Sequence, residues 1–557
     1  MLPSSIRPTV SETTITKVTR LFNGTLTDIL NELLQNARRA GAEQIRIDYE
    51  PRAEGSIRLT IHDDGSGIED PAKLLTLGSS GWDSEIQGRE DPAGMGVFSL
   101  AGREVTISSR HALHDHGWAV AIPADAWTGE ADLALVPADH PIGTMIAFSV
   151  SDDQEHHLTT AIKAAAKYYP QQVMMNGVPC PQEAFLAEAL HIVEWRGSRI
   201  GVFAGSNPHG SPTANFHGLT ITGSLGRLSE PLNGQSFHAR IDIGDTPELQ
   251  LVLPARKEFM VNACHAELKI ACERAIFETI AQRPSHRLSF EQWQRAAELG
   301  ISMPEAEQVL IHWQPGEQDY RNSGSGYSVT AVTDRSILVE EDEIFIEQPM
   351  DRALTGNALR PHLLEPHQGY GGYSWYDALP KLHDIAFVVA TDDGDIRIAT
   401  GDENRQVLTS DIKAGSITCH WAVTLRDGTT DRHSIATDLA FSMDEQGWST
   451  ELDDMGIAWT PQRGLDPAQL VGLLQAVCFS PSDDCGADSW DTQQERFLCE
   501  ARSRARSVLL SADEAIIDDI RELIASNRWR LPQGRAVAIA VDRDTIEVSL
   551  GALPEAA

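Results

Sequence analysis

A carboxylate and a carboxamide stand one helical turn apart near the start of the chain. The segment NELLQNARRA, which begins at Asn31, places Glu32 and Asn36 at positions i and i+4. Residues four apart lie on the same face of a helix, so both side chains can reach one site. An amide oxygen suits magnesium that is shared with phosphates and water. A carboxylate one turn earlier can orient or deprotonate a water near a terminal phosphate.

Two glycine-containing motifs follow this helix. The first, HDDGSGI, contains Asp63, Gly65 and Gly67, and the second, DPAGMGVFSL, contains Gly94 and Gly96. The carboxylate of the first motif can accept a hydrogen bond from an adenine amino group, and its glycines let the ring approach the backbone. The second motif opens a predicted helix, whose bare N–H groups favour phosphate. Each motif alone is common, but their order and spacing indicate a nucleotide site.

This arrangement resembles the GHKL superfamily, which includes the ATPases of gyrase B, the ninety-kilodalton heat-shock chaperone, histidine kinases and MutL. The resemblance covers about residues 10–180. It implies ATP and magnesium as ligands, a catalytic role for Glu32 and magnesium binding by Asn36. The residues that it places at the nucleotide are Asn36, Asp63, Gly65, Gly67, Ser80, Gly94, Met95, Gly96 and Thr144.

The sequence departs from the family pattern at several positions. Arg39 stands where the family usually has an acidic residue, and Asp64 stands where asparagine is usual. The second glycine motif has Asp91 in place of an early glycine. Residues 78–93 form a short lid segment, so we expect closure over ATP to be less complete than in the chaperone.

The order of predicted elements favours an α+β sandwich over residues 1–182, with helices on a mixed sheet, and the resemblance implies that this sandwich is of the Bergerat type. An amphipathic helix ends at Gly41, and the alternating segments that follow read as a hairpin. The predicted strands are 44–50, 56–63, 104–109, 117–123, 131–137 and 143–150, and a second helix is predicted at 158–172.

The next block, residues 183–285, has strands and a long helix and resembles the transducer domain of the same superfamily, with a β-α-β order. The resemblance makes Arg256 the first candidate, and Lys257 the second, for a catalytic contact to the terminal phosphate. A solvated pair that caps a strand is the alternative for these two residues.

The rest of the chain carries no recognised motif. We expect a helical segment and linker at 286–328, with the helical pattern at 286–315 and the linker at 321–328, followed by a C-terminal α+β region of unknown role at 329–557. Strands are predicted at 342–348 and 384–401, and a strand pair at 536–550. Helices are predicted at 467–479 and 512–527. The histidines of RHALHDHGW indicate a solvated hairpin loop rather than a metal site, and the acidic segment 391–403 a hairpin turn rather than a calcium loop.

Composition limits the class of protein. A chain of 557 residues predicts three or four domains, and 41% hydrophobic with 23% charged residues is typical of a globular protein. The net charge of −36 disfavours a nucleic-acid or membrane partner. Seven scattered cysteines indicate reduced thiols in a cytoplasm. We expect no signal peptide and no membrane-spanning segment.

These observations together predict a cytoplasmic, magnesium-dependent and slow ATPase of the heat-shock-chaperone-like type. Its ATP cycle would move domains on a protein client or partner, and the resemblance implies a possible homodimer. Two alternatives stay open. One is an ATP sensor that binds nucleotide without hydrolysing it, and the other is a DNA-maintenance or phage-defence ATPase like MutL or the microrchidia proteins.

Overall fold

The computed structural model divides the chain into two compact units, Met1–Ala306 and Glu307–Ala557. Each unit has its own hydrophobic packing. The described residues are 25–52, 56–74, 96–128, 132–151, 155–252, 258–319, 328–340, 342–400, 407–408, 410–443, 451–461, 464–525, 528–530, 533, 535–542 and 544–552.

Helix α2 (Leu26–Arg39) ends just before Gly41, as the sequence predicts. At its start, the Thr25 hydroxyl accepts a hydrogen bond from the backbone N–H of Asp28, and the Asp28 carboxylate accepts one from the backbone N–H of Thr25. This reciprocal pair satisfies donors that the first helical turn leaves open. Just beyond its end, Gly41 has a φ of +73°, the left-handed conformation that stops helices.

The first sheet has eight strands in the order β5-β4-β3-β6-β2-β1-β7-β8. Its strands are β1 (Ile45–Arg52), β2 (Ser56–Asp63), β3 (Val105–Arg110), β4 (Gly117–Ile122), β5 (Leu135–Ala138), β6 (Gly143–Ser151), β7 (Val173–Met175) and β8 (Val178–Pro179). The β1–β7 pair is parallel and the other pairs are antiparallel. The predicted mixed sheet is therefore confirmed.

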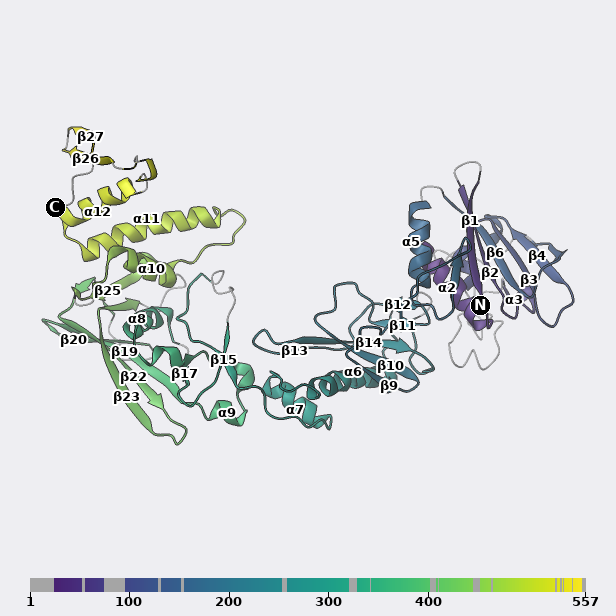
Figure 1. Ribbon diagram of the computed structural model, residues 1–557, viewed down its shortest axis with the longest axis horizontal. Helices are drawn as coiled ribbons and strands as arrows, with labels where there is room; N and C mark the ends of the chain where they lie inside the picture. The colour runs from purple at the N-terminus through teal and green to yellow at the C-terminus, as the bar shows by residue number, and fades with distance from the viewer. Residues whose placement is uncertain are drawn as a thin grey trace, which may run out of the picture. The chain divides into compact units, whose positions relative to one another are not determined.

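Helices α2 and α5 (Glu155–Ala166) pack with this sheet in one core (Figure 1). The prediction extended the second helix to residue 172, but it ends at Ala166. Pro170 explains the difference, because a proline lacks an N–H and disfavours helical conformation in the residue before it.

The second sheet of the first unit has the order β12-β11-β14-β10-β9, with β13 beside β14. Its strands are β9 (His191–Trp195), β10 (Ser198–Ala204), β11 (Ala214–Phe216), β12 (Leu219–Ile221), β13 (Arg227–Ser229) and β14 (Ser236–Ile243). Helix α6 (Ala263–Ala281) packs on these strands. Among the described residues the helix follows the sheet, where the resemblance implied a β-α-β order.

The helical segment expected at 286–315 is much shorter. Helix α7 (Phe290–Glu298) is followed by Gly300, whose φ of +80° ends the helical conformation. Strand β15 (Val309–Ile311) then pairs with β16 (Val329–Ala331). The linker predicted at 321–328 lies almost wholly outside the described residues.

The second unit is built on two further sheets. The larger has the order β18-β17-β19-β22-β23, with β20 beside β19, and the smaller has the order β21-β25-β24. Their strands are β17 (Ile337–Val339), β18 (Leu363–Leu364), β19 (Lys381–Thr391), β20 (Gly394–Ala399), β21 (Ile412–Lys413), β22 (Ser416–Thr424), β23 (Thr430–Thr437), β24 (Leu439–Met443) and β25 (Met455–Trp459). The hairpin predicted at 384–401 is confirmed as β19 and β20.

The strand predicted at 342–348 is wrong, because this segment belongs to helix α8 (Ile344–Leu354). Its β-branched and aromatic run, Ile344–Ile346, between polar residues is also what a short strand shows. Both Glu347 and Gln348 are buried, however, and they are hydrogen-bonded through the backbone N–H and carbonyl of Gly316. A helix buried on more than one face loses the pattern by which sequence separates helix from strand.

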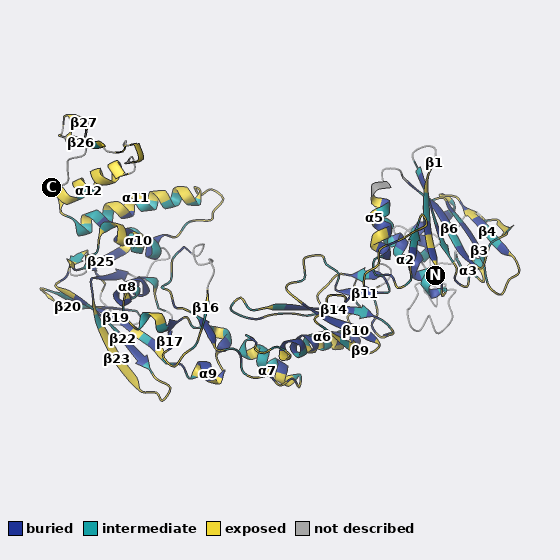
Figure 2. Ribbon diagram, in the orientation of Figure 1, coloured by how far each residue is buried: buried dark blue, intermediate teal, exposed yellow. Residues whose placement is uncertain are grey.

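The C-terminal helices are α10 (Pro467–Cys478), α11 (Trp490–Leu509) and α12 (Ala512–Ala525). The predicted helices at 467–479 and 512–527 are confirmed as α10 and α12, and the predicted strand pair is β26 (Arg535–Val541) with β27 (Ile546–Ala552). Figure 2 shows that α12 is largely exposed, whereas α10 contributes to the core.

No described helix has the length and apolar character that crossing a membrane requires.

A buried ion pair in the second unit gives a test of this packing. Arg352 of α8 donates from Nε and Nη2 to the two carboxylate oxygens of Asp438, at 2.9 and 2.7 Å. The Asp438 side chain is fully buried. We expect Arg352→Ala to lower the free energy of unfolding by about 3–5 kcal/mol, because it leaves this carboxylate without its partner. Urea unfolding would measure the loss.

Arg496→Ala is the matched control. It removes an ion pair to Asp488 in which both side chains are exposed, and such pairs contribute at most about 1 kcal/mol. An equal loss of unfolding free energy in the two variants would show that the buried ion pair contributes no more to stability than an exposed one.

Candidate functional site

The structure brings three predicted residues together at one point. Glu32 and Asn36 are half-buried on α2, and Gly96 begins the short helix η1 (Gly96–Leu100). A Cβ atom on Gly96 would lie 3.0 Å from Asn36 Nδ2 and 3.3 Å from Glu32 Oε2. The base candidate, the amide candidate and the second glycine motif therefore meet, as their spacing predicted.

The helix at this point differs from the expected one. Residues 96–100 form a 3₁₀ helix of five residues, where the sequence predicted an ordinary helix opened by two glycines. A short 3₁₀ turn has a small dipole, so any attraction for phosphate rests on its backbone N–H groups. Ser80, Gly94 and Met95 lie outside the described residues, and their assignment to the nucleotide stays a prediction.

Asp63 ends β2 and faces Thr144 of β6 in the antiparallel ladder. The backbone N–H of Gly65 donates to Asp63 Oδ1 at 3.1 Å. Burial raises the pKa of the Asp63 carboxyl from 3.8 to about 6. Hydrogen bonds from the backbone N–H groups of Gly65 and Thr144 oppose this rise, and the negative charge of Asp64 adds to it. One oxygen of this carboxyl group already accepts a hydrogen bond. A ligand that donates a hydrogen bond to the other oxygen would stabilise the ionised form, which burial makes costly.

Ser109 connects the parts around Asp63, although it belongs to none of the motifs found in the sequence. The side chain is fully buried at the end of β3. Its hydroxyl accepts from the backbone N–H of Ile68 at 2.9 Å, donates to the Gly143 carbonyl at 2.8 Å and lies 3.1 Å from Thr144 Oγ1. Ser109 therefore holds the first glycine motif against the start of β6.

Gly67 and Gly143 are needed by the packing of the chain itself. A Cβ atom on Gly67 would lie 2.1 Å from the Arg110 carbonyl oxygen, and one on Gly143 would lie 2.1 Å from the Asp63 carbonyl oxygen. Both residues have positive φ, +75° and +124°. Close backbone approach to a nucleotide was the sequence-based reason for Gly67, but backbone–backbone contact already requires a glycine there.

The two unusual residues of the motifs make definite contacts. Asp64 Oδ1 accepts from the backbone N–H groups of Glu43 and Gln44, at 2.8 and 2.9 Å, so its carboxylate fixes the turn into β1. Arg39 is 8% exposed, and its Nη1 donates to Asn36 Oδ1 at 3.2 Å. The supporting contact that the family makes with an acid is thus replaced by a contact from a cation.

This contact bears on the magnesium expected at Asn36. The oxygen that would bind the metal accepts a hydrogen bond from a guanidinium, which is charged at every accessible pH. A divalent cation on the same oxygen would face that charge at short range, so the arrangement does not fit a magnesium ion held by Asn36. Within the described ranges, no group of three or more His, Cys, Asp or Glu side chains could hold a metal ion.

Helix α2 also contacts the second sheet. Gln35 is buried, and its Nε2 donates to the carbonyls of Phe216 at 3.2 Å and His217 at 2.8 Å. These carbonyls lie at the tip of the β11–β12 hairpin. Beside them, Tyr169 packs under Gly218 and donates its hydroxyl to the Leu34 carbonyl at 2.7 Å. Sequence reasoning did not find Gln35, although it lies between Glu32 and Asn36.

Arg256 and Lys257 lie outside the described residues, so their predicted contact to a terminal phosphate stays a prediction. The chain on either side of them is described. Leu251 and Phe259 form an isolated antiparallel bridge, which brings the two ends of the segment together.

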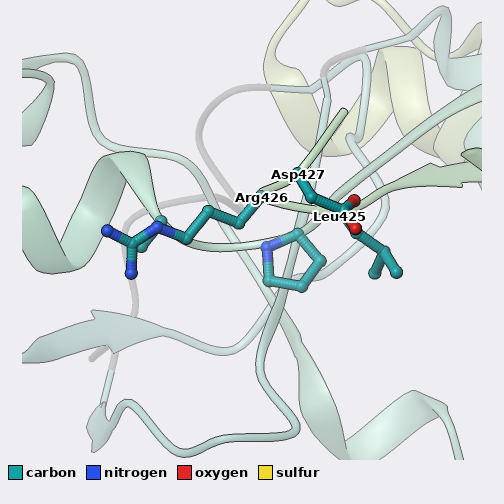
Figure 3. A pocket seen from close by; sticks show the side chains of 5 residues that line it. Leu425, Arg426 and Asp427 are labelled. Atoms are coloured by element: carbon teal, nitrogen blue, oxygen red, sulfur yellow. The ribbon is translucent and has the colours of Figure 1, made fainter. Parts of the chain in front are cut away.

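A cavity of about 560 Å³ lies in the second unit (Figure 3). Its lining residues are Ala378, Pro380, Leu425, Arg426 and Asp427. The Asp427 carboxylate is already engaged, because it accepts from the backbone N–H and the hydroxyl of Thr429, and these bonds lower its pKa. We assign no role to this cavity.

Comparison with known proteins agrees with the geometry of the first unit. Residues 25–118 match the sequence model of a family described as "Histidine kinase-, DNA gyrase B-, and HSP90-like ATPase". This segment includes α2, the first glycine motif and η1. The fold and the site define a helix-on-sheet domain of the nucleotide-binding type. The N-terminal domain of this chain belongs to the GHKL superfamily.

Relatives with assigned names are mismatch-repair proteins. The chain is 32% identical over 120 residues to the DNA mismatch repair protein MutL of Actinobacillus pleuropneumoniae, a match that covers 21% of this chain and 19% of that protein. It is 34% identical over 128 residues to MutL of Aliivibrio fischeri, covering 21% of this chain and 18% of that protein. The chain thus spans about a fifth of the length of these relatives.

Similar solved structures include the Aquifex aeolicus MutL ATPase domain complexed with ADP, at 14% identity and a TM-score of 0.25, covering 40% of this chain and 94% of that one. Another is the ATPase region of Saccharomyces cerevisiae topoisomerase II, at 10% identity and a TM-score of 0.33, covering 49% of this chain and 85% of that one. At such low sequence identity and TM-score, similarity to these structures is not evidence of function.

Asp63→Asn tests the adenine contact. Because Gly65 already donates to one oxygen of Asp63, the amide of the variant would keep its oxygen there and turn its NH₂ toward the adenine amino group, donor against donor. We expect ATP affinity to fall by roughly 5- to 150-fold, measured by calorimetry. Asp64→Asn is the control, since an amide oxygen can still accept from Glu43 and Gln44.

The same variant should not be less stable. A carboxyl whose pKa is raised in the folded chain contributes stability below about pH 4, and that contribution is lost as the pH rises through about 6. Asp63→Asn should remove this pH dependence and melt at or above the wild-type temperature at pH 7. Unchanged ATP affinity in Asp63→Asn would remove this residue from the site.

Proposed function

We propose that this protein binds ATP at the α2–η1 site and hydrolyses it slowly. The observation that supports this most is the convergence of Glu32, Asn36 and Gly96 at one point, on the two motifs that the superfamily uses. In this proposal Asp63 accepts from the adenine amino group, and Thr144 lies beside it in the ladder.

The proposed chemistry needs a base and room for phosphate. A Cβ atom at Gly96 would be crowded by Asn36 Nδ2 at 3.0 Å and Glu32 Oε2 at 3.3 Å, so a glycine lets the backbone of η1 lie against these two side chains. A phosphate bound beside them would be within reach of the bare N–H groups of η1. Glu32 would orient or deprotonate the attacking water. The expected magnesium dependence rests on the resemblance alone, because the contact from Arg39 to Asn36 does not favour the metal at that oxygen.

We further propose that the second sheet senses the nucleotide, as a transducer-like domain would. Gln35 supports this, because it lies on the helix of the base and hydrogen-bonds the tip of the β11–β12 hairpin. Movement of α2 by the bound phosphates would be transmitted through these two bonds. Arg256 or Lys257 would add a direct contact to the terminal phosphate.

A protein client or partner, a homodimer and a cytoplasmic location complete the proposal, with the ATP cycle moving domains in a chaperone-like manner. A DNA-maintenance role is the second candidate, since relatives that match about a fifth of this chain are named mismatch-repair proteins. The net charge of −36 opposes it, because DNA carries the same sign. Salt-sensitive binding of duplex DNA would favour the second candidate.

Glu32→Ala tests the assignment of the base. The carboxylate acts on water rather than on the nucleotide, so ATP affinity should remain while phosphate release falls by about 10²–10⁴-fold. Glu50→Ala, which removes an exposed carboxylate from β1, is the control. Wild-type turnover in Glu32→Ala would rule out this role. Wild type that binds ATP and releases no phosphate would support the non-hydrolysing sensor.

Gln35→Ala tests the coupling. The change leaves the carbonyls of Phe216 and His217 without their donor, at a cost of about 1–3 kcal/mol for such buried groups. We expect ATP still to bind, while the protection that it gives to amides of the β11–β12 hairpin is lost in hydrogen exchange. Gln44→Ala, at an exposed position, is the control. Equal protection in both variants would contradict the coupling.

A further inference from the structure

The position of Arg39 places a positive charge inside the proposed site. Its side chain is 8% exposed, and its Nη1 lies 3.2 Å from Asn36 Oδ1. The same Asn36 amide lies 3.0 Å from the position of a Cβ on Gly96, and Glu32 Oε2 lies 3.3 Å from it. The amide and the carboxylate therefore lie against the glycine, and the guanidinium lies against the oxygen of that amide.

The electrostatic reach of Arg39 covers more than this contact. Burial raises the pKa of the Tyr169 hydroxyl. The positive charges of Arg38 and Arg39 oppose this rise, and the negative charge of Asp63 adds to it. Arg39 and Asp63 therefore both act on one buried phenol.

A buried guanidinium affects a metal and a phosphate in opposite ways. It repels a divalent cation on the oxygen to which it donates, and the shielding from water strengthens that repulsion. It attracts phosphate oxygens, for which its planar set of donors is well suited. The charge that magnesium commonly neutralises in a bound nucleoside triphosphate can then be neutralised by the chain itself.

We infer that Arg39 supplies charge to the phosphates of the bound nucleotide in place of much of the magnesium, so that ATP binding by this protein depends only weakly on the metal. This rests on the proposed function of the site. It assigns a nucleotide-binding role to the residue that stands where the superfamily usually has an acid.

The test compares ATP affinity in magnesium chloride with affinity in EDTA, by calorimetry on the full chain. For wild type we expect the two dissociation constants to agree within about threefold. In Arg39→Gln, affinity in EDTA should fall by about tenfold or more, the loss expected for a charge-assisted hydrogen bond. Affinity in magnesium should be kept, because the metal can now bind at Asn36.

Two further variants serve as controls for Arg39→Gln. Arg39→Lys retains the charge and should keep most of the affinity in EDTA. Arg38→Gln removes the neighbouring arginine, whose Nε donates to Gln35 Oε1 at 3.4 Å, and should leave the ratio of the two affinities within about twofold of wild type. Melting temperatures in the absence of nucleotide check that each variant folds.

A wild-type protein whose ATP affinity falls more than about tenfold in EDTA would overturn the inference, as would an Arg39→Gln variant with wild-type affinity in both buffers. Either result leaves the ATP site itself intact. Wild type that binds no ATP in either buffer would instead overturn the proposed function, and the inference with it.

Discussion

The packing of α2 on the first sheet is the interaction on which the site depends. Leu30, Leu33 and Ala37 are buried in that core, which fixes the rotation of the helix about its axis. With the rotation fixed, Glu32 and Asn36 stay half-buried at the border of the core and meet Gly96. A slip by one residue would turn the helix by about 100° and carry both polar side chains away from η1. Hydrophobic burial thus holds the polar groups in place before any ligand arrives.

The same helix connects the site to its surroundings through buried polar side chains. Gln35 reaches the second sheet, and Arg39 reaches Asn36. Buried polar groups are costly unless they are paired, so these contacts lock the helix to its neighbours as well as satisfying the side chains. The contacts of Gln35 and Asn36 therefore begin on adjacent residues of one helix.

The side of the site proposed to bind adenine depends on a different constraint. Asp63, Gly65 and Thr144 come from β2, the following turn and β6, and a fully buried Ser109 hydroxyl binds the turn to the strand. Burial that raises the pKa of Asp63 works against the folded chain near neutral pH. A carboxylate at such a position lowers the stability of the fold. This favours a functional role for Asp63 over a purely structural one.

The sequence by itself determined the first half of the fold and the central residues of the site. Helix α2 has one apolar stripe, a capping box and a glycine stop, and β1 and β2 alternate in period two, so local rules were sufficient. Only the tertiary structure decided the identity of α8, because its buried Glu347 is satisfied by a distant backbone N–H and sequence pattern does not show such partners. The roles of Ser109, Gln35 and Arg39 were decided in the same way. Their partners are carbonyls, N–H groups and an amide brought close by folding, and no spacing along the chain records those distances.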